Sequence, residues 1–281
     1  MRTLVHLSDL HFGSVDSTLL EPLRTRVREA QPHLVAVSGD LTQRAKPEQF
    51  REARVFLDTL PKPQVVVPGN HDVPLYNVFM RFFRPFYRYH HYIGENLEPE
   101  YIDEEIAVIG INTARSFTFK GGRINEEQLA RVQARICHLG DTVTKIIVTH
   151  HPFDVPDRLE KGGQIIGRAD MAMEALARCG VDVLLSGHLH ASHTSHTVAR
   201  YKIAGFSALV VQAGTATSTR LRGESNSFNI LRVAHPLIRV EQYTWDPELG
   251  DFRLSKSGAF DHTPEGWITK TTSLMAHTRP G

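Results

Sequence analysis

The sequence has few cysteines and almost no net charge. Its two cysteines, Cys137 and Cys179, belong to no C-x-x-C or zinc-knuckle pattern, which indicates neither a disulfide framework nor a thiolate metal site, so we expect buried free thiols. Lysine and arginine total 32 against 31 aspartate and glutamate, a formal net charge of +1 at pH 7. Because this charge provides no broad field for nucleic acid or an anionic membrane, any phosphate recognition must be local.

The sequence also lacks long apolar runs. It begins MRTLVHLSDLHFG, with no basic start followed by a long apolar segment and a small-residue cleavage site, so we expect no secretory signal there. No run elsewhere approaches the roughly 20 residues that cross a membrane. We therefore expect a cytoplasmic protein without a membrane partner. The length of 281 residues favours one large domain, and leaves open whether the chain forms a homo-oligomer.

Histidine is frequent, with 16 residues, and imidazole is the commonest metal ligand among side chains. Through the first two thirds of the chain, short β-rich runs alternate with stretches of helical period, which is typical of an α/β fold. The predicted strands are residues 3–7, 34–38, 65–67, 106–111, 145–149 and 181–186. The predicted helices are residues 18–30, 47–60, 125–139 and 169–177.

After residue 187 the pattern changes to short alternating runs separated by turn residues, which predicts an antiparallel β meander in the C-terminal third. The strands expected there are residues 201–204, 209–213, 228–233, 239–245 and 252–257. The stretch at about 74–105 is too long for an ordinary connection between strands, and we interpret it as a partly helical insertion lying over the functional site. We expect the main domain to span residues 1–260, followed by a tail at 261–281.

Polar side chains follow the predicted strands at the points where the strands end. In an open α/β sheet the carboxyl ends of the strands line one edge, so these groups should converge in space. Carboxylate, amide and imidazole ligands without thiolate suit Mn, Fe, Zn or Mg. Each fragment alone could be a turn stabilised by its own hydrogen bonds, but solvated turns prefer Asn, Ser and Gly to histidine. The clusters are Asp9 and His11, Asp40, Asn70 and His71, His150 and His151, and His188 and His190.

These clusters form the motif set D-x-H, G-D, G-N-H-D, H-x-P and G-H-x-H. The set resembles that of the calcineurin-like metallophosphoesterase superfamily, particularly its bacterial cyclic-nucleotide phosphodiesterase-like group, over residues 3 to about 231. The resemblance implies a four-layer α/β/β/α sandwich that holds two metal ions, Mn, Fe or Zn. This expectation agrees with the independently predicted change from α/β to antiparallel β structure.

The resemblance also implies how the ligands are divided, with Asp40 shared between the two ions. Two cations close together need a shared anionic ligand, and a carboxylate with two oxygens can bridge where an imidazole cannot. His151 follows the ligand His150 on an extended segment and should point the opposite way. The implied ligands are Asp9, His11, Asp40 and His190 for one ion, and Asp40, Asn70, His150 and His188 for the other.

The implied reaction is hydrolysis of a small phosphodiester, with a 3′,5′- or 2′,3′-cyclic nucleotide as the example, by in-line attack of a hydroxide held between the ions. We expect His71 to contact a phosphate oxygen or protonate the leaving oxygen, with Asp72 orienting its imidazole. The segment 213–231 carries Arg220 and Arg222, and we assign Arg222 to the phosphate oxygens. A solvated turn is the alternative for both arginines.

Three other functions compete with this one. Phosphomonoesterase activity is a near alternative, because a dinuclear centre does not by itself choose between monoesters and diesters. A DNA exonuclease of the Mre11 type would need an added region with a basic face, which the near-neutral charge and the short C-terminal part disfavour. A non-catalytic scaffold that lost its metals would have lost ligands, whereas all seven positions here hold competent side chains.

Overall fold

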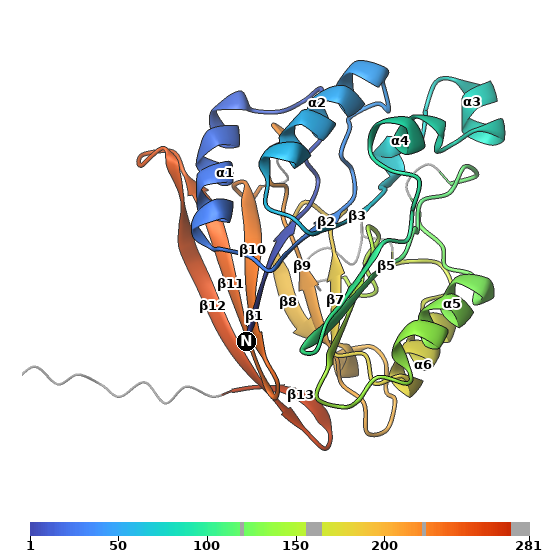
Figure 1. Cartoon of the computed structure of the whole chain (residues 1–281), viewed down its shortest axis with the longest axis vertical. Helices are drawn as coiled ribbons and strands as arrows, with labels where there is room; N and C mark the ends of the chain where they lie inside the picture. The colour runs from blue at the N-terminus through green and yellow to red at the C-terminus, as the bar shows by residue number, and fades with distance from the viewer. Residues whose placement is uncertain (119–120, 156–164, 221–222, 271–281) are drawn as a thin grey trace, which may run out of the picture.

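Two β-sheets lie face to face between two layers of helices (Figure 1). This computed structural model describes residues 1–118, 121–155, 165–220 and 223–270. The strand order is β13-β12-β11-β10-β1-β2-β3 in the first sheet and β4-β5-β6-β7-β9-β8 in the second. The first sheet contains β1 (Arg2–Leu7), β2 (Leu34–Ser38), β3 (Gln64–Val67), β10 (Ser227–Ala234), β11 (Leu237–Asp246), β12 (Asp251–Thr263) and β13 (Gly266–Thr269). The second contains β4 (Glu100–Ile102), β5 (Ile106–Gly110), β6 (Thr144–Val148), β7 (Val183–Ser186), β8 (His193–His196) and β9 (Leu209–Gln212).

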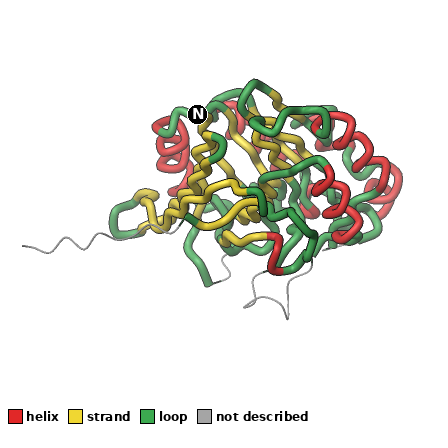
Figure 2. The backbone as a smooth tube through the Cα atoms, turned by 90° about the horizontal axis from the view of Figure 1, so that it is seen from below, coloured by secondary structure: helices red, strands yellow, loops and turns green. Residues whose placement is uncertain are grey.

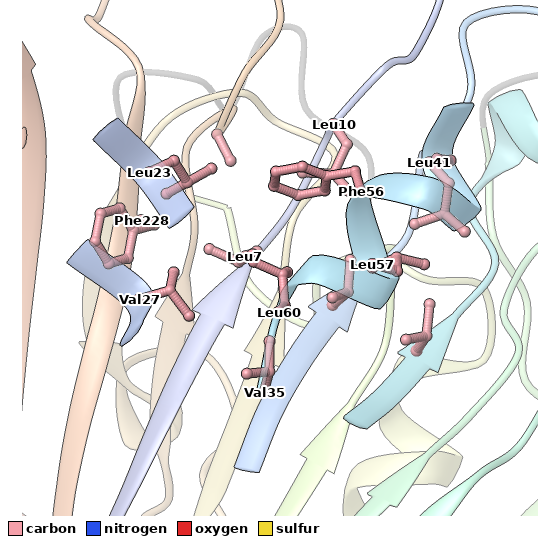
Figure 3. Packing of buried hydrophobic residues seen from close by; sticks show 14 of the residues in the cluster. Leu7, Leu10, Leu23, Val27, Val35, Leu41, Phe56, Leu57, Leu60 and Phe228 are labelled. Atoms are coloured by element: carbon pink, nitrogen blue, oxygen red, sulfur yellow. The ribbon is translucent and has the colours of Figure 1, made fainter. Parts of the chain in front are cut away.

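The first helical layer forms because α1 and α2 each carry an apolar stripe. Helix α2 (Pro47–Thr59) begins with proline at its first turn and buries Phe50, Ala53 and Leu57, which recur at helical spacing. Helix α1 (Leu20–Glu29) buries Leu23 and Val27. In Figure 3, Leu23, Val27 and Leu57 of these two helices lie in one apolar cluster with labelled residues of β1, β2 and β10, which are Leu7, Val35 and Phe228. The parallel strands β1, β2 and β3 are therefore covered on their outer face.

The second helical layer also forms because its helices, α5 and α6, carry apolar faces. Helix α5 (Glu126–Ile136) begins at the predicted capping box, in which the Asn125 side chain accepts from the Gln128 amide. Together with α6 (Ala169–Arg178) it packs its apolar face on the parallel strands β5, β6, β7 and β9. A third apolar cluster, including Val67 of β3 and Val148 of β6, fills the space between the sheets. Figure 2 shows the strands enclosed by helices on opposite sides. The predicted four-layer sandwich is confirmed.

Several local predictions were wrong. Residues 201–204 form no strand, and β9 continues the parallel sheet beside β7 instead of joining an antiparallel meander. The connection between β7 and β9 contains the short strand β8 and the 3-10 helix η4 (Thr197–Ala199), so the sequence has no helical signal to reveal a parallel crossover. The strands β10, β11 and β12 do form the expected antiparallel ladder.

The segment predicted as an insertion is partly helical, with α3 (Val78–Phe83), α4 (Tyr87–Tyr92) and the edge strand β4. Helix α4 packs against α2, where Tyr92 stacks on Phe50 at a ring separation of 6.2 Å. The Tyr89 hydroxyl donates to the Val66 carbonyl at the end of β3. This helix therefore belongs to the first core and supports the strand that leads to the G-N-H-D motif.

No helix among the described residues is long and apolar enough to cross a membrane.

The cysteines are joined, so the expectation of free thiols was wrong. The disulfide links Cys137, at the end of α5, to Cys179, at the end of α6, across a separation of 42 residues. The sequence spacing carried no signal for this pair, because the packing of α5 against α6 brings the two helix ends together.

Strand pairing continues past residue 260, where we expected the main domain to end, and residues 271–281 of the expected tail lie outside the described residues. Strand β12 continues to Thr263, and β13 pairs with it through Gly266–Thr269. Trp267 is buried against the inner core and donates from Nε1 to Asp182 Oδ1 at 2.7 Å. The sheet therefore extends through residue 269.

We predict that Trp267→Ala lowers the free energy of unfolding by about 3–5 kcal/mol, because it removes a buried indole and leaves Asp182 Oδ1 without its donor. Ile268→Ala is the matched control, since this neighbour is 48% exposed, and it should cost less than about 1 kcal/mol. Urea unfolding followed by circular dichroism measures both. Similar values for the two variants would show that β13 contributes little to the core.

Candidate metal centre

The loops that follow β1, β2, β6 and β7 meet at one edge of the two sheets. The Asp9 amide donates to the Gly39 carbonyl, and the His11 amide donates to the Asp40 carbonyl, so the first two loops run side by side. In the second sheet, the Gly187 amide donates to the His150 carbonyl, so the loops after the paired strands β6 and β7 also run side by side. The predicted convergence of polar groups at strand ends is therefore present in the structure.

Five of the predicted ligands have a left-handed backbone, which is uncommon for residues other than glycine. This conformation turns the chain sharply where each strand ends and aims the side chain across the sheet edge. Among the described residues such strain concentrates at this site, and it persists because the flanking ladders fix the chain on both sides. The φ angles are 53° at Asp9, 52° at His11, 53° at Asp40, 71° at His188 and 56° at His190.

Two glycines allow the loops to approach closely. A Cβ at Gly69 would lie 2.1 Å from Asp40 Oδ1, and a Cβ at Gly187 would lie 1.7 Å from Ser8 Oγ and 2.5 Å from Asp9 Oδ2. Both distances are far inside van der Waals contact. The absence of a side chain at these positions is therefore what lets the carboxylates reach the neighbouring loop.

The first group of ligand atoms surrounds Asp9. Its Oδ1 lies 3.3 Å from His190 Nε2 and 3.5 Å from His11 Nε2. The Nε2 atoms of these two histidines are 3.3 Å apart, and His11 Nε2 is 3.6 Å from Asp40 Oδ2. All four side chains are at least 96% buried. Two carboxylates and two imidazoles thus point at one small volume.

The second group lies on the other side of Asp40. The Oδ1 atom of Asp40 is 3.4 Å from His150 Nε2. That nitrogen is also 3.1 Å from Asn70 Oδ1 and 3.2 Å from His188 Nδ1. The two oxygens of Asp40 therefore face different groups, which is the arrangement that a bridging carboxylate requires.

The surrounding hydrogen bonds orient the side chains of Asp9, His150 and His190 toward the centre of the site. His150 Nδ1 donates to the Ser38 carbonyl, and His190 Nδ1 donates to the Arg220 carbonyl, which directs each Nε2 lone pair inward. Asp9 Oδ2 accepts from the Ser8 hydroxyl and the His188 amide. Asp9 Oδ1 is buried and has no hydrogen-bond partner. A buried anionic oxygen without a donor is costly, so the residues fit bound metal ions.

The pKa shifts of Asp40 and its histidine neighbours also indicate that the site favours a bound cation. Burial alone would raise the pKa of Asp40, but the neighbouring histidines, foremost His150, hold it well below its usual range. Burial opposes protonation of His150, yet the negative charge of Asp40 raises its pKa to about 9. Burial and the charge of His150 lower the pKa of His188 to about 3. Asp40 thus stabilises a cation beside it, and a metal ion would displace the proton from His150.

His71 and Asp72 lie beside this centre with different contacts from those expected. His71 Nδ1 donates to the Gln43 carbonyl at 2.9 Å, so the expectation that Asp72 orients the imidazole was wrong. The carboxylate of Asp72 accepts from the backbone amides of Leu41, Thr42 and Gly69. It therefore ties the loops after β2 and β3 together. Burial and the charge of Asp40 raise the pKa of Asp72 to about 6 against these hydrogen bonds.

The structure places Arg220 at the site, although the residue expected to bind phosphate there was Arg222. Arg220 Nη1 donates to His71 Nε2 at 3.2 Å and to Gln43 Oε1 at 3.4 Å. Arg222 lies outside the described residues. A cavity next to the ligands is lined by Gln43, Arg44, Asn70, His71, Val73, Leu75 and Arg220. Gln43 and Arg44 carried no sequence signal, because they sit in an irregular loop after the G-D motif.

His151 lies closer to the centre than predicted. One of its ring nitrogens is within 4.8 Å of ligand nitrogens on His150 and His188. Its Nδ1 shares a hydrogen bond of 2.8 Å with the Thr113 hydroxyl, and its ring packs on Gly122, where a Cβ would lie 2.3 Å away. These contacts hold the His151 ring beside the second group of ligands. Alternation of side chains along an extended segment had predicted that this ring would point away from His150.

The two-sheet fold and the grouped histidine and carboxylate side chains, which could hold metal ions, are characteristic of a phosphoesterase. Residues 2–192 match the family model of the calcineurin-like phosphoesterases. The chain belongs to this family.

Two curated relatives are similar to the chain. The glycerophosphodiester phosphodiesterase GpdQ of Enterobacter lignolyticus is 26% identical over 161 residues, covering 53% of this chain and 57% of that protein. The uncharacterized protein YpbG of Bacillus subtilis is 26% identical over 192 residues, covering 67% of this chain and 61% of that protein. The chain thus spans about three fifths of the length of these relatives.

A solved structure supports the fold alone. The purple acid phosphatase PPD1 from yellow lupin seeds superimposes with a TM-score of 0.71 at 13% identity, covering 92% of this chain and 53% of that one.

We predict that Asp40→Ala lowers metal occupancy at both positions, because it removes the carboxylate whose two oxygens face the two groups. His150→Ala should also lower metal content, whereas His151→Ala should leave it largely intact. Elemental analysis after dialysis against Mn measures the ions per chain, with the exposed carboxylate variant Asp58→Ala as control. Loss of metal in His151→Ala but not in His150→Ala would exchange the roles of the two histidines.

We predict that Gly187→Ala displaces the Asp9 carboxylate and reduces metal content, since the new methyl group would overlap Ser8 and Asp9. Gly140→Ala is the control, because a Cβ there meets nothing within 4 Å. Metal content and thermal unfolding are measured together. A Gly187→Ala protein with the metal content of the unaltered protein would contradict the proposed close approach.

Proposed function

We propose that this chain hydrolyses a small phosphodiester using two metal ions, Mn, Fe or Zn, held by the seven predicted ligands. The observation that carries the proposal is the pair of ligand groups on opposite sides of Asp40, with each carboxylate oxygen facing one group. Bound ions would supply Lewis acidity and activate water at neutral pH. The remaining chemistry, which is binding and orienting the phosphate and moving a proton, falls to residues of the adjoining cavity.

Arg220 and His71 are placed to receive the phosphate. Arg220 is a fixed cation whose guanidinium can donate to two oxygens, and in this structure it donates to His71 Nε2. Because His71 Nδ1 donates to a carbonyl, the neutral ring presents the Nε2 lone pair to the cavity, and the protonated ring presents an N–H there. His71 can therefore orient a phosphate oxygen or, once protonated, donate to the leaving oxygen.

A diester is favoured over a monoester by the likeness to GpdQ, whose name describes a phosphodiesterase. The second alkyl group of a diester would need an apolar wall, and Val73 and Leu75 supply one beside His71. Cyclic nucleotides remain the example that we propose to test first, with glycerophosphodiesters beside them.

A substrate panel with added Mn tests this proposal. It contains 2′,3′- and 3′,5′-cyclic nucleotides, glycerophosphodiesters, bis-p-nitrophenyl phosphate and p-nitrophenyl phosphate. Faster turnover of at least one natural diester than of the monoester is expected. A strong monoester preference would assign the chain to the phosphomonoesterases, and metal content well below one ion per chain would support a non-catalytic role.

We predict that His71→Ala retains metal but loses turnover by about 10²–10⁴-fold on a diester with an alkoxide leaving group, which is the usual value of general acid help. The loss should be smaller with a nitrophenolate, which needs less protonation. Steady-state kinetics on a glycerophosphodiester and on bis-p-nitrophenyl phosphate compare the two. Equal losses would assign His71 to phosphate orientation, and unchanged rates would remove it from the reaction.

A further inference from the structure

The exposed aromatic residues of the protein are gathered in one place. Every phenylalanine, tyrosine or tryptophan that is exposed in the described part of the chain lies in residues 76–87 or at position 117. Phe83 is 73% exposed and Phe117 is 85% exposed. In Figure 1 the helix α3 that carries three of these residues stands at a corner of the molecule, away from the sheets. The aromatic face comprises Tyr76, Phe79, Phe82, Phe83, Tyr87 and Phe117.

A buried arginine holds the aromatic face in place. Arg81 of α3 is 2% exposed and donates to the carbonyls of Ser116, Thr118 and Pro74 at 2.7, 2.8 and 3.0 Å. These bonds join α3 to the loop that carries Phe117, whose ring lies 5.2 Å from that of Phe82. The rings are therefore presented to solvent by an anchored scaffold. Exposing a contiguous group of large apolar side chains in this way is typical of an interaction surface.

The segment that carries most of the aromatic face has basic residues, among them the buried Arg81, and no acidic ones. Residues 74–94 contain three arginines and no aspartate or glutamate. The Arg84 guanidinium lies 5.9 Å from the ring centre of Tyr87, and that of Arg44 lies 5.7 Å from the ring centre of Tyr76. The net charge of +1 conceals this local excess, because acidic residues elsewhere balance it.

We propose that the aromatic face docks on the surface of an anionic lipid membrane. Aromatic rings with arginine beside them are the composition that favours the boundary between headgroups and acyl chains, and the missing acidic residues remove repulsion from anionic lipid. A second copy of the chain fits less well, because a symmetric contact would bring the arginines of one face against those of the other. This inference replaces the expectation of no membrane partner, which rested on the near-zero net charge and on the lack of an apolar run of membrane-spanning length.

Docking in this way would place the catalytic cavity near lipid headgroups. Leu75 lines the cavity beside His71, and the next residue, Tyr76, belongs to the aromatic face. Membrane binding itself does not depend on the proposed hydrolysis, so it can be measured whatever the substrate panel shows.

Co-sedimentation of the full chain with vesicles tests the proposal. One set of vesicles is phosphatidylcholine alone, and the other is an equal mixture of phosphatidylcholine and phosphatidylglycerol. We expect binding to the anionic vesicles, weakened about tenfold or more in the double variant Phe79→Ser, Phe83→Ser, because each ring loses its burial in lipid. Arg84→Gln should weaken binding about fivefold on the anionic vesicles.

The matched control is the double variant Leu249→Ser, Leu254→Ser, which alters two exposed apolar residues of the β11–β12 hairpin. It should bind as the unaltered protein does, and all variants should hydrolyse a small soluble diester equally. Absence of binding to anionic vesicles would overturn the proposal. A second result would also overturn it: a dimer that dissociates in the double phenylalanine variant, with no binding to vesicles. The aromatic face would then be a contact between copies of the chain.

Discussion

A single buried carboxylate organises the site. Asp40 is 1% exposed, and its two oxygens face histidines that arrive from opposite directions, His11 from the first sheet and His150 from the second. A buried negative charge is tolerated only where positive charge and hydrogen bonds compensate it. The His71 amide supplies one such hydrogen bond to Oδ1. The loops after four strands therefore supply the groups that compensate the negative charge of Asp40.

The rigid sandwich compensates for an unfavourable local backbone. Left-handed residues cost free energy at each occurrence, of the order of 1–3 kcal/mol, and the site contains several of them. Burial of the three apolar clusters against and between the sheets is what keeps such turns from relaxing. The site is therefore formed as a property of the whole sandwich, and Asp72 adds a local tie by joining the loops after β2 and β3.

The sequence predicted the elements whose signal is local. The strand at β3 and the helix at α2 follow from β-branched runs, a proline at the first turn and apolar spacing, and the strand-end motifs follow from a rule about sheet edges. Contacts set by tertiary packing were missed. The pairing of Cys137 with Cys179 depends on how α5 meets α6, and the contact of Arg220 with His71 depends on an irregular loop without periodicity. The carboxylate of Asp72 was expected to contact the His71 ring but accepts from backbone amides. A short polar motif does not reveal which backbone amides lie nearby.

The first strand of the sheet is paired with one of the last. Strand β1 leads directly into Asp9 and His11, and it lies between β2 and β10, with Arg2 opposite Val233. During synthesis, the edge of β1 that β10 later covers stays unpaired until more than 230 residues have left the ribosome. Contacts of such long sequence separation form slowly and leave a strand edge open to wrong partners. Strand β10, which lies beyond the part matched by the family model, therefore decides when a nascent chain can first pair both edges of β1.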